Sequence, residues 1–246
     1  MRAPNIVSRH RVSPDVVRIT VLLPVLDEAE NLPAVLGDLA RWSRTRGVPL
    51  DVVVCDNGST DGSPEVAQAH RARVVHAPAR GYGNALMAGL HAALGAPPEV
   101  MVIVDADGSC VIDDLDALLA PLAAHEADLV IGDRTRLAEA GSLTRAQRVG
   151  NLVATRIIAA TSGLRTRDLG PFRAIRAEAL LALEMCDPTW GWNVEMHLKA
   201  ARAGLRVREV PVRYRPRAAG ASKISGSWRG AARAGVRMLQ ACWRYA

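Results

Sequence analysis

Short apolar runs alternate with longer stretches of helical composition along the first half of this chain. The runs are rich in Val, Ile and Leu, which favour β-strands, and they lie at 16–25, 50–55, 74–75, 101–104 and 129–131. Helices are expected between them, up to about Arg44, His70 and Leu94, and then from Asp113 to His125. Strands that alternate with helices are typical of a parallel sheet with helices on both faces. The sequence therefore predicts a Rossmann-like α/β fold.

Polar residues follow these runs at the points where each predicted strand ends. They are Asp27 and Glu28, Asp56 and Asn57, Asp105 and Asp107, and Asp133 with Arg134. The carboxyl ends of parallel strands meet at one edge of a sheet, and ligands of such sheets bind there. We therefore expect these side chains to line one site.

The stretch Val102-Ile103-Val104-Asp105-Ala106-Asp107 predicts a metal site. Asp105 and Asp107 are two residues apart at the end of a buried strand, so they would share a face. Two neighbouring carboxylates repel each other, and a hard divalent cation that also binds phosphate oxygens removes that repulsion, as Mg²⁺ or Mn²⁺ would. The alternative is that both are loop and cap residues before the next helix.

The segment Arg80-Gly81-Tyr82-Gly83-Asn84 opens a predicted helix and allows two interpretations. Glycines at a helix start would let a diphosphate approach free backbone N–H groups. Alternatively, they would only permit a tight connection. The spacing matches neither a Walker loop nor a complete dinucleotide fingerprint.

Composition limits the remaining possibilities. A chain of 246 residues with 49% hydrophobic residues can bury one large core. Its four cysteines are widely spread, which favours neither a zinc site nor a disulfide framework and fits a reducing cytoplasm. We find neither a signal peptide nor an apolar run of about 18 residues, so we expect a protein that is not integral to the membrane.

The net charge of +6 is concentrated in the C-terminal region. The last 46 residues carry eleven Lys or Arg and one acidic residue. A helix is predicted from Trp228 to Ala246, with its tryptophans and its arginines on different sides. This composition fits an interfacial membrane helix, and a helix packed on the sheet with its arginines in water is the alternative. Because the aromatic residues lie away from the arginines, nucleic-acid binding is not favoured.

The ordered motifs resemble those of a family 2 glycosyltransferase with the GT-A fold, in the branch of the dolichol-phosphate mannose synthases and other polyprenyl-phosphate glycosyltransferases. The similarity extends from about Ile19 to Gly226. The motifs are Pro24-Val-Leu-Asp-Glu28-Ala-Glu-Asn31, Cys55-Asp56-Asn-Gly-Ser-Thr-Asp61-Gly, Arg80-Gly-Tyr-Gly-Asn-Ala85, Asp105-Ala-Asp107, Gly132-Asp133-Arg134, Asp168-Leu-Gly-Pro-Phe-Arg173, Trp190-Gly-Trp-Asn-Val-Glu195 and Ser222-Lys223-Ile-Ser-Gly226. The implied organisation is an N-terminal arm at 1–15, a GT-A domain at 16–226 and the basic amphipathic helix at 227–246.

The resemblance implies a donor site. It would place Pro24, Leu26, Glu28 and Asp56 around the nucleoside, Arg80 near the nucleotide, and Asp105 and Asp107 on a metal that holds the diphosphate of a GDP-, UDP- or dTDP-linked sugar. This chain departs from the family at two positions. Asn57 replaces the second aspartate of a pair, and Ser109 stands where the synthases commonly carry a glutamine that helps to hold the metal.

The resemblance also implies an acceptor side with a basic group for the lipid phosphate. In the similar synthases, arginines after the fifth strand and on the next helix hold this phosphate. Arg134 matches the first, and Arg145 or Arg148 the second. The wider candidate group is Arg134, Arg145, Arg148, Arg215, Arg217 and Lys223, each of which could instead be a solvated surface charge.

The chemistry of the acceptor decides which other groups are needed. A phosphate acceptor is ionised near neutral pH and needs no general base, whereas a hydroxyl would need one, for which Asp168 and Glu195 are the candidates. Asp107 would contribute to catalysis through the metal, which neutralises the departing diphosphate. Trp190 and Trp192 would either stack on sugar or prenyl surfaces or anchor the helix at 193–202. The segment 216–227 resembles a mobile lid over the donor.

The sequence thus predicts a metal-dependent, inverting glycosyltransferase that moves a sugar from a nucleotide donor to a polyprenyl phosphate. It would work at the inner face of the cell membrane, as a cytoplasmic or peripheral protein bound to an anionic surface. Two alternatives stay open at this point. One is the same fold acting on a soluble metabolite hydroxyl, and the other is a nucleotide-binding protein with weak or no transferase activity.

Overall fold

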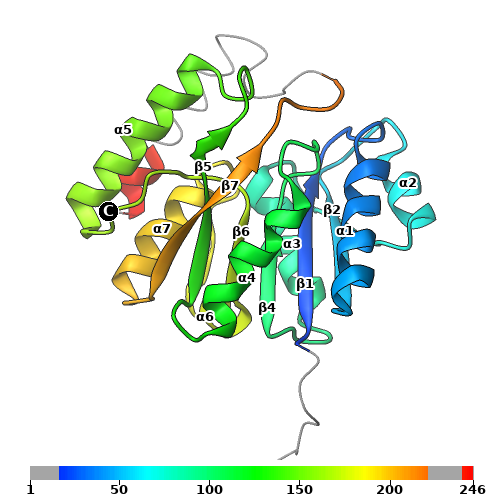
Figure 1. Ribbon diagram of the computed structural model, residues 1–246, viewed down its shortest axis with the longest axis horizontal. Coiled ribbons are helices and arrows are strands. Elements are labelled where there is room, and N and C mark those ends of the chain that lie inside the picture. Colours follow the sequence, from blue (N-terminus) through cyan, green and yellow to red (C-terminus); the bar gives the residue numbers. More distant parts are fainter. Residues whose placement is uncertain (1–16, 221–239, 246) are drawn as a thin grey trace, which may run out of the picture.

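The computed structural model describes residues 17–220 and 240–245 and places seven strands in one sheet (Figure 1). The strands are β1 (Ile19–Val25), β2 (Leu50–Asp56), β3 (Arg73–His76), β4 (Val100–Ile103), β5 (Leu129–Ala138), β6 (Arg173–Arg176) and β7 (Val207–Tyr214), in the order β3-β2-β1-β4-β6-β5-β7. Only β6 runs antiparallel to its neighbours β4 and β5. The predicted, mostly parallel α/β sheet is confirmed.

Seven α-helices connect these strands. They are α1 (Leu32–Arg46), α2 (Ser63–Ala69), α3 (Tyr82–Ala93), α4 (Leu115–Ala123), α5 (Arg145–Ser162), α6 (Ala177–Ala182) and α7 (Trp192–Arg202), and a 3₁₀ turn at Ile112–Asp114 precedes α4. The longest, α5, begins with a capping box in which Thr144 and Gln147 satisfy each other's backbone N–H groups. It ends at Gly163, whose positive φ of 74° terminates the helix.

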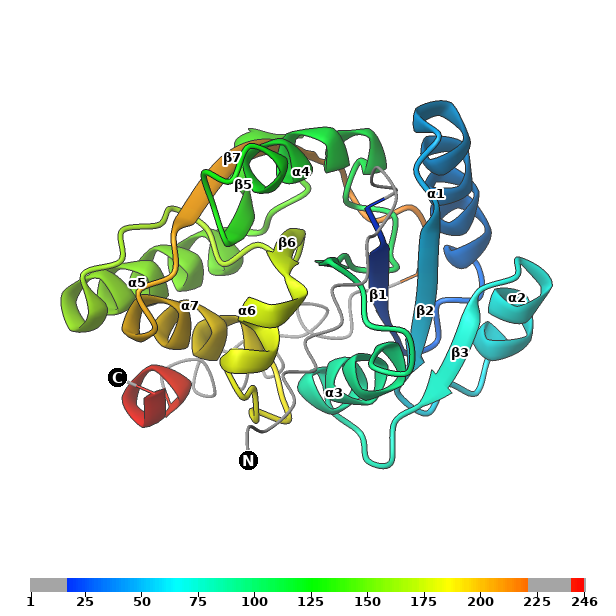
Figure 2. The ribbon, with the colours of Figure 1, turned by 90° about the horizontal axis from the view of Figure 1, so that it is seen from below.

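The helices cover both faces of the sheet, as the view in Figure 2 shows. Successive residues of a strand point to opposite faces, so Val21 and Leu23 of β1 pack with α1 and α4 while Leu22 packs with α3. The same alternation places Val102 on the first face and Met101 on the second. Both faces of the central strands are therefore buried, which explains their continuous apolar composition.

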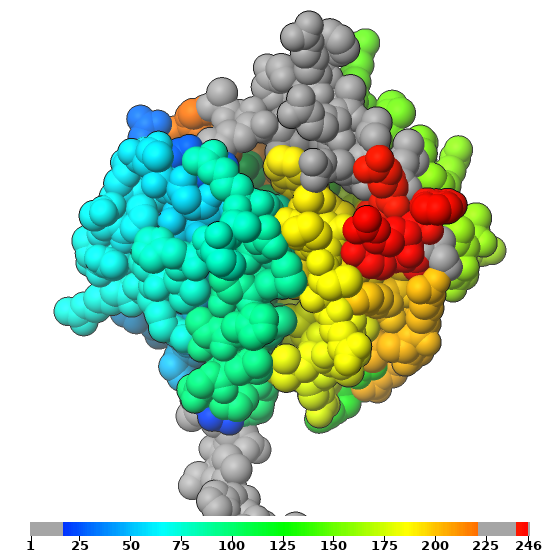
Figure 3. Space-filling model, turned by 180° about the vertical axis from the view of Figure 1, so that it is seen from behind, coloured from blue at the N-terminus to red at the C-terminus, as the bar shows by residue number. Residues whose placement is uncertain are grey.

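A third apolar cluster joins α5 and α7 to the C-terminal segment 240–245. Ala154 and Ile158 of α5 pack there against Val194 and Leu198 of α7. Ala241, Cys242 and Tyr245 complete the cluster, and Figure 3 shows this segment lying against the α6–α7 region. Trp243 points away and is 88% exposed, so this turn docks by one edge. The rest of the predicted C-terminal helix and the N-terminal arm at 1–15 lie outside the described residues.

The structure corrects several predicted boundaries. β1 begins at Ile19 rather than at residue 16, and β5 continues to Ala138 rather than ending at Ile131. The edge strand β7 escaped prediction because charged residues and Pro211 interrupt its apolar alternation. Among the described residues, no helix is both long enough and apolar enough to span a bilayer.

Candidate active site

The carboxyl ends of β1, β2 and β4 bring the predicted donor residues to one edge of the sheet. Pro24 and Val25 of β1 are in register with Cys55 and Asp56 of β2. On the other side of β1, Leu22 pairs with Ile103, so the chain reaches Asp105 just beyond the end of β4. Strand register therefore places the polar ends of three strands side by side.

Asp105 and Asp107 form the acidic centre of this edge. Asp105 accepts a hydrogen bond from the Tyr82 hydroxyl at 3.3 Å, and Asp107 accepts one from the backbone N–H of Ser109 at 2.9 Å. Burial and the nearby charge of Asp107 raise the pKa of Asp105 to about 7. The two carboxylates thus repel each other in the free protein, which is the property expected of a cation site.

The donor set fits a divalent metal that a diphosphate helps to bind. No group of three His, Cys, Asp or Glu side chains that could hold a metal occurs within residues 17–220 and 240–245. Two carboxylates alone leave most positions of a six-coordinate hard cation to phosphate and water oxygens. Asp105 and Asp107 could therefore hold Mg²⁺ or Mn²⁺ together with a bound diphosphate. Ser109, in place of the family's glutamine, is buried, and its backbone oxygen accepts a hydrogen bond from the N–H of Arg215.

A third carboxylate, that of Glu28, is linked to the acidic centre by Arg217. The buried Glu28 carboxylate forms an ion pair with Arg217 and accepts a hydrogen bond from Asn31 at 2.8 Å. A second nitrogen of Arg217 lies 3.6 Å from Asp107. Arg217 was predicted to bind the acceptor phosphate, and the structure places it against Glu28 and Asp107, two of the residues predicted for the donor site.

Asp56 is fixed at the end of β2 by three donors. Its carboxylate accepts hydrogen bonds from the N–H groups of Gly58 and Ser59, and His76 lies 2.9 Å away. Burial alone would raise the pKa of Asp56, but the hydrogen bonds from Ser59 and His76 outweigh burial and lower it. The carboxylate is therefore held ionised in one orientation.

The glycines at the start of α3 allow the backbone of another segment to pack closely against this turn. A Cβ added to Gly83 would lie 1.8 Å from the carbonyl oxygen of Asp187, and one on Gly81 would lie 2.1 Å from that of Pro188. The N–H of Gly81 donates to the Asn57 side chain at 2.8 Å, and the N–H of Asn84 donates to Pro188. The structure therefore favours the tight-connection interpretation of this segment, because the backbone at 187–188 lies where side chains at Gly81 and Gly83 would be. Asn57, the family departure, serves to hold this turn.

Arg80 lies beside the donor edge with an exposed side chain. Its guanidinium donates a hydrogen bond to the carbonyl oxygen of Gly58 at 3.0 Å. Pro24 and Leu26 are half-buried at the end of β1. These residues border the same edge as Asp56, as the sequence predicted for a nucleoside pocket.

The predicted acceptor side centres on a buried pair between Arg134 and Asp168. The Asp168 carboxylate accepts hydrogen bonds from the backbone N–H of Arg134 and from its side-chain Nε and Nη2, at 2.7–2.9 Å. Burial would raise the pKa of Asp168, but the bonds and charge of Arg134 lower it instead. Gly170 permits this geometry, since a Cβ there would lie 2.5 Å from the Gly132 carbonyl oxygen. Asp168 is therefore committed to orienting Arg134.

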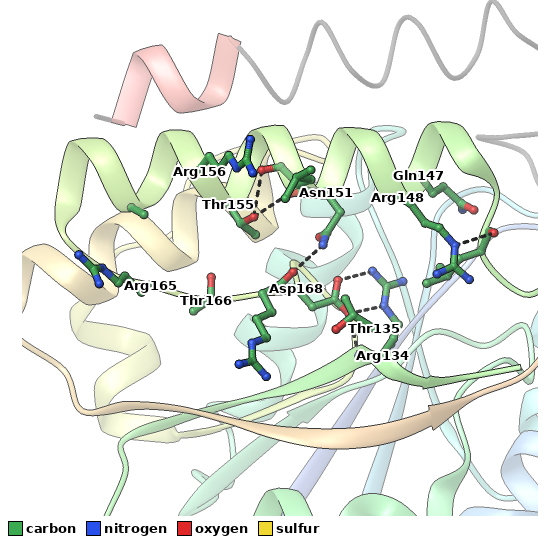
Figure 4. Close-up of a pocket in the computed structure, with 14 residues that line it drawn as sticks. Arg134, Thr135, Gln147, Arg148, Asn151, Thr155, Arg156, Arg165, Thr166 and Asp168 are labelled. Atoms are coloured by element: carbon green, nitrogen blue, oxygen red, sulfur yellow. Dashed lines mark hydrogen bonds and ion pairs between the residues drawn. The ribbon is translucent and has the colours of Figure 1, made fainter.

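A cavity of about 550 Å³ lies beneath α5, next to this pair (Figure 4). Five arginines and three apolar side chains are among the residues that line it, namely Arg134, Arg148, Arg156, Arg165, Arg167, Leu143, Leu152 and Ala159. Arg148 lines the cavity, and Arg145 is not among its lining residues. The hydroxyl of Thr166 also lines it and is buried without a hydrogen-bond partner among the described residues. The residues of α5 that line the cavity extend from Gln147 to Ala159, which corresponds to about 18 Å along the helix axis.

The other predicted site residues have different environments. Glu195 is fully buried, and its carboxylate accepts hydrogen bonds from the backbone N–H groups of Cys186 and Asp187. It also forms an ion pair with Lys199, whose Nζ lies 2.8 Å from Oε1 of Glu195. Trp192 is fully buried in the core under α7, which confirms the anchor interpretation, while Trp190 is half-buried. Arg145 and Arg215 are exposed, and Lys223 lies outside the described residues.

Three functional features escaped the sequence reasoning. Tyr82 reaches Asp105 from α3, and Tyr214 places its ring 4.9 Å from the Arg134 guanidinium. Arg156, Arg165 and Thr166 join the cavity through the packing of α5 on the segment before β6. Only the motif that contains Tyr82 carried a local signal, and the others depend on tertiary packing.

The fold, the acidic centre at Asp105 and Asp107, and the arginine-lined cavity under α5 together define an enzyme of the GT-A glycosyltransferase class. The family model for glycosyl transferase family 2 matches residues 20–182, and the chain belongs to this family. It is 41% identical over 212 residues to an uncharacterized glycosyltransferase of Mycobacterium tuberculosis, covering 86% of this chain and 92% of the relative. It is 32% identical over 223 residues to the undecaprenyl-phosphate mannosyltransferase of Micrococcus luteus, covering 85% and 88%. These relatives support the polyprenyl-phosphate branch that the motifs indicate.

Solved structures show the same fold. The crystal structure of glucosyl-3-phosphoglycerate synthase from Mycobacterium tuberculosis, in complex with Mn²⁺, UDP-glucose and phosphoglyceric acid, aligns with a TM-score of 0.69. It covers 92% of this chain and 80% of its own, at 22% identity. At that identity the likeness concerns the fold alone.

Proposed function

We propose that this glycosyltransferase moves a hexose from a nucleoside diphosphate to a polyprenyl phosphate at a membrane surface. The observation that carries the proposal is the cavity under α5, which is lined by arginines together with the apolar side chains of Leu143, Leu152 and Ala159. This combination suits an anionic head joined to an apolar chain, and the relative from Micrococcus luteus is named for such an acceptor.

On the donor side, Asp105 and Asp107 would hold Mg²⁺ or Mn²⁺ against the donor's diphosphate. When bound, the metal neutralises the charge that develops on the departing nucleoside diphosphate. Asp56, fixed by three hydrogen bonds, would bind the nucleoside end, with Pro24, Leu26 and Arg80 around it. The Mn²⁺ complex of the structural neighbour agrees with a divalent cation in this fold.

On the acceptor side, Arg134 and Arg148 would hold the phosphate. Asp168 orients Arg134, so its guanidinium faces the cavity in a fixed position. Because a phosphate monoester is ionised near neutral pH, its oxygen can attack the sugar without a general base. This agrees with the internal bonding of Asp168 and Glu195, for which we propose positioning roles.

The exposed face of α5 supports a lipid acceptor. Val149, Leu152 and Val153 are 61%, 48% and 43% exposed and lie on one side of the helix, next to Arg145 and Arg156. Apolar residues flanked by arginines are typical of a helix that rests in the headgroup region of an anionic membrane. We therefore propose that α5, together with the exposed Trp243, brings the cavity to the membrane surface.

The experiment is a transfer assay combined with liposome sedimentation. We expect transfer from a nucleotide sugar to a short polyprenyl phosphate with Mn²⁺, and binding to vesicles that contain phosphatidylglycerol. The double variant V149S/V153S should lose vesicle binding while its melting temperature stays unchanged, since both side chains are largely exposed and neither is among the residues that line the cavity. Vesicle binding that this variant retains in full would contradict the membrane role of α5.

A soluble phosphorylated acceptor is the second candidate. Arg156, Arg165 and Arg167 line the cavity beyond Arg134 and would suit a second anionic group, such as a carboxylate. The structural neighbour was solved with phosphoglyceric acid, a small acceptor of this kind. Efficient transfer to such a compound, with none to the prenyl phosphate, would favour this candidate.

A further inference from the structure

Arg217 bridges two acidic side chains of the donor edge. It lies in the segment that follows β7, where its guanidinium pairs with the Glu28 carboxylate. Nη1 of Arg217 lies 3.6 Å from Oδ2 of Asp107, and Nε donates to the carbonyl oxygen of Ala219 at 2.7 Å. One cation from the C-terminal part of the chain thus connects the loops that follow β1 and β4.

The segment around Arg217 packs directly on these loops. The N–H of Ala218 donates to the backbone oxygen of Asp107 at 3.3 Å. The Asn31 side chain donates both to Glu28, at 2.8 Å, and to the carbonyl oxygen of Ala219, at 3.2 Å. The position of the Arg217 backbone is therefore linked to the same acids that its side chain contacts.

The charges at this edge make Arg217 a competitor of a metal ion. Two other buried arginines interact with Asp105 electrostatically, and both are held elsewhere. Arg134 has Asp168 as its bidentate partner, and Arg173 donates to the carbonyl oxygens of Leu169 and Gly170. Arg217, in contrast, contacts both the Glu28 and the Asp107 carboxylates, and its own side chain is only 18% exposed. A divalent ion binds a carboxylate oxygen at about 2.0–2.2 Å, so an ion on Asp107 would lie within a few ångströms of the guanidinium. At such separations the repulsion between like charges is substantial.

We propose that Arg217 is a built-in counter-cation that holds Asp107 and Glu28 in the absence of metal, leaves Asp107 when a divalent cation binds, and then contacts the donor's diphosphate. The inference deepens the proposed function, since it takes Asp107 as a metal ligand. The diphosphate is the anion that would approach the displaced guanidinium, because it binds the same cation. Metal alone should therefore bind weakly, and metal with nucleotide should bind tightly.

The test measures Mn²⁺ binding by electron paramagnetic resonance, with and without a nucleoside diphosphate. The nucleotide is chosen from UDP, GDP and dTDP as the one that most stabilises the wild-type protein. For Arg217→Gln we expect Mn²⁺ alone to bind about tenfold more tightly, equivalent to about 1.4 kcal/mol. The same variant should bind the nucleotide about tenfold more weakly in the presence of Mn²⁺. The matched control is Arg215→Gln, which removes the same charge from an exposed position two residues away and should leave the affinity for Mn²⁺ alone within about twofold.

The outcomes separate this inference from the proposed function. If Asp107→Asn abolishes Mn²⁺ binding but Arg217→Gln binds Mn²⁺ alone no more tightly than the wild type, the counter-cation role is wrong and the metal site stands. An equal gain in Arg217→Gln and Arg215→Gln would also overturn the inference, because net charge would then explain it. If the wild-type protein binds no Mn²⁺ with any of the three nucleotides, both proposals fail. Circular dichroism would confirm that each variant is folded.

Discussion

The proposed donor and acceptor sides of the site use carboxylates in opposite ways. On the donor side, Asp105 and Asp107 lie beside each other, and the pKa of Asp105 is raised to about 7 by burial and by its neighbour's charge. On the acceptor side, Asp168 is buried against Arg134, whose bonds lower the pKa of Asp168. The first arrangement costs the free protein stability and is relieved by an external cation. The second is neutralised internally and fixes an arginine, so the two sides should respond differently to mutation and pH.

The largest expected difference between the two sides concerns turnover. Asp107→Asn should lower metal-dependent sugar transfer by about a thousandfold, since a metal contributes several kcal/mol to transition-state stabilisation. Its melting temperature should change little, because the change removes the repulsion from Asp105 and the attraction to Arg217 together. Steady-state kinetics and thermal unfolding measure both quantities. Full activity in this variant would remove Asp107 from the metal site.

Asp168→Asn should have the opposite profile. It leaves the Arg134 guanidinium buried without its charged partner, and loss of one member of a buried ion pair costs about 3 kcal/mol or more of unfolding free energy. Chemical denaturation measures this loss. A neutral double variant, R134M/D168L, should recover much of the stability without recovering activity, since it removes both charges together. Stability of Asp168→Asn equal to the wild type would contradict the comparison.

Within the acceptor side, the structure separates two arginines of α5. Arg148 lines the cavity and Arg145 does not. Arg148→Ala should raise the KM for polyprenyl phosphate about tenfold, the effect of losing a charge-assisted hydrogen bond to phosphate, with a smaller change in kcat. Arg145→Ala is the matched control on the same helix and should change KM by less than about twofold. Equal effects of the two substitutions would show that α5 contributes only general positive charge.

The donor side was more predictable from the sequence than the acceptor side, for a physical reason. Its residues directly follow apolar strands, and strand ends in a parallel sheet converge, so Glu28, Asp56 and the Asp105/Asp107 pair could be grouped from local signals. The sequence left the role of Gly81 and Gly83 open, because a glycine motif does not reveal whether a ligand or the Asp187–Pro188 backbone lies close to them.

The acceptor side depends on contacts between distant segments. The cavity forms where α5 packs over the segment before β6, and no local pattern reveals that Arg156 and Arg165 face the same space as Arg134. The position of Arg217 was also unpredictable, since 189 residues separate it from its partner Glu28. The positive charge of this region indicated that it binds anionic groups, but it could not assign each arginine to the donor side or to the acceptor side.

The smallest expected effect is a difference in pH dependence. The pKa of Asp105 in the folded protein, about 7, exceeds its unfolded value of about 3.9, so the folded state binds more protons between these values and loses stability as pH rises through that window. Asp105→Asn should therefore raise the melting temperature most above pH 7, with the gain shrinking toward pH 4. Asp168 has the opposite sign: its lowered pKa contributes stability above about pH 4, and that stability is lost as the solution is acidified. Melting curves of the wild type, Asp105→Asn and Asp168→Asn from about pH 2 to 8 measure both trends. Parallel curves for the two variants would show that the carboxylates of the two sides do not differ in the way their environments imply.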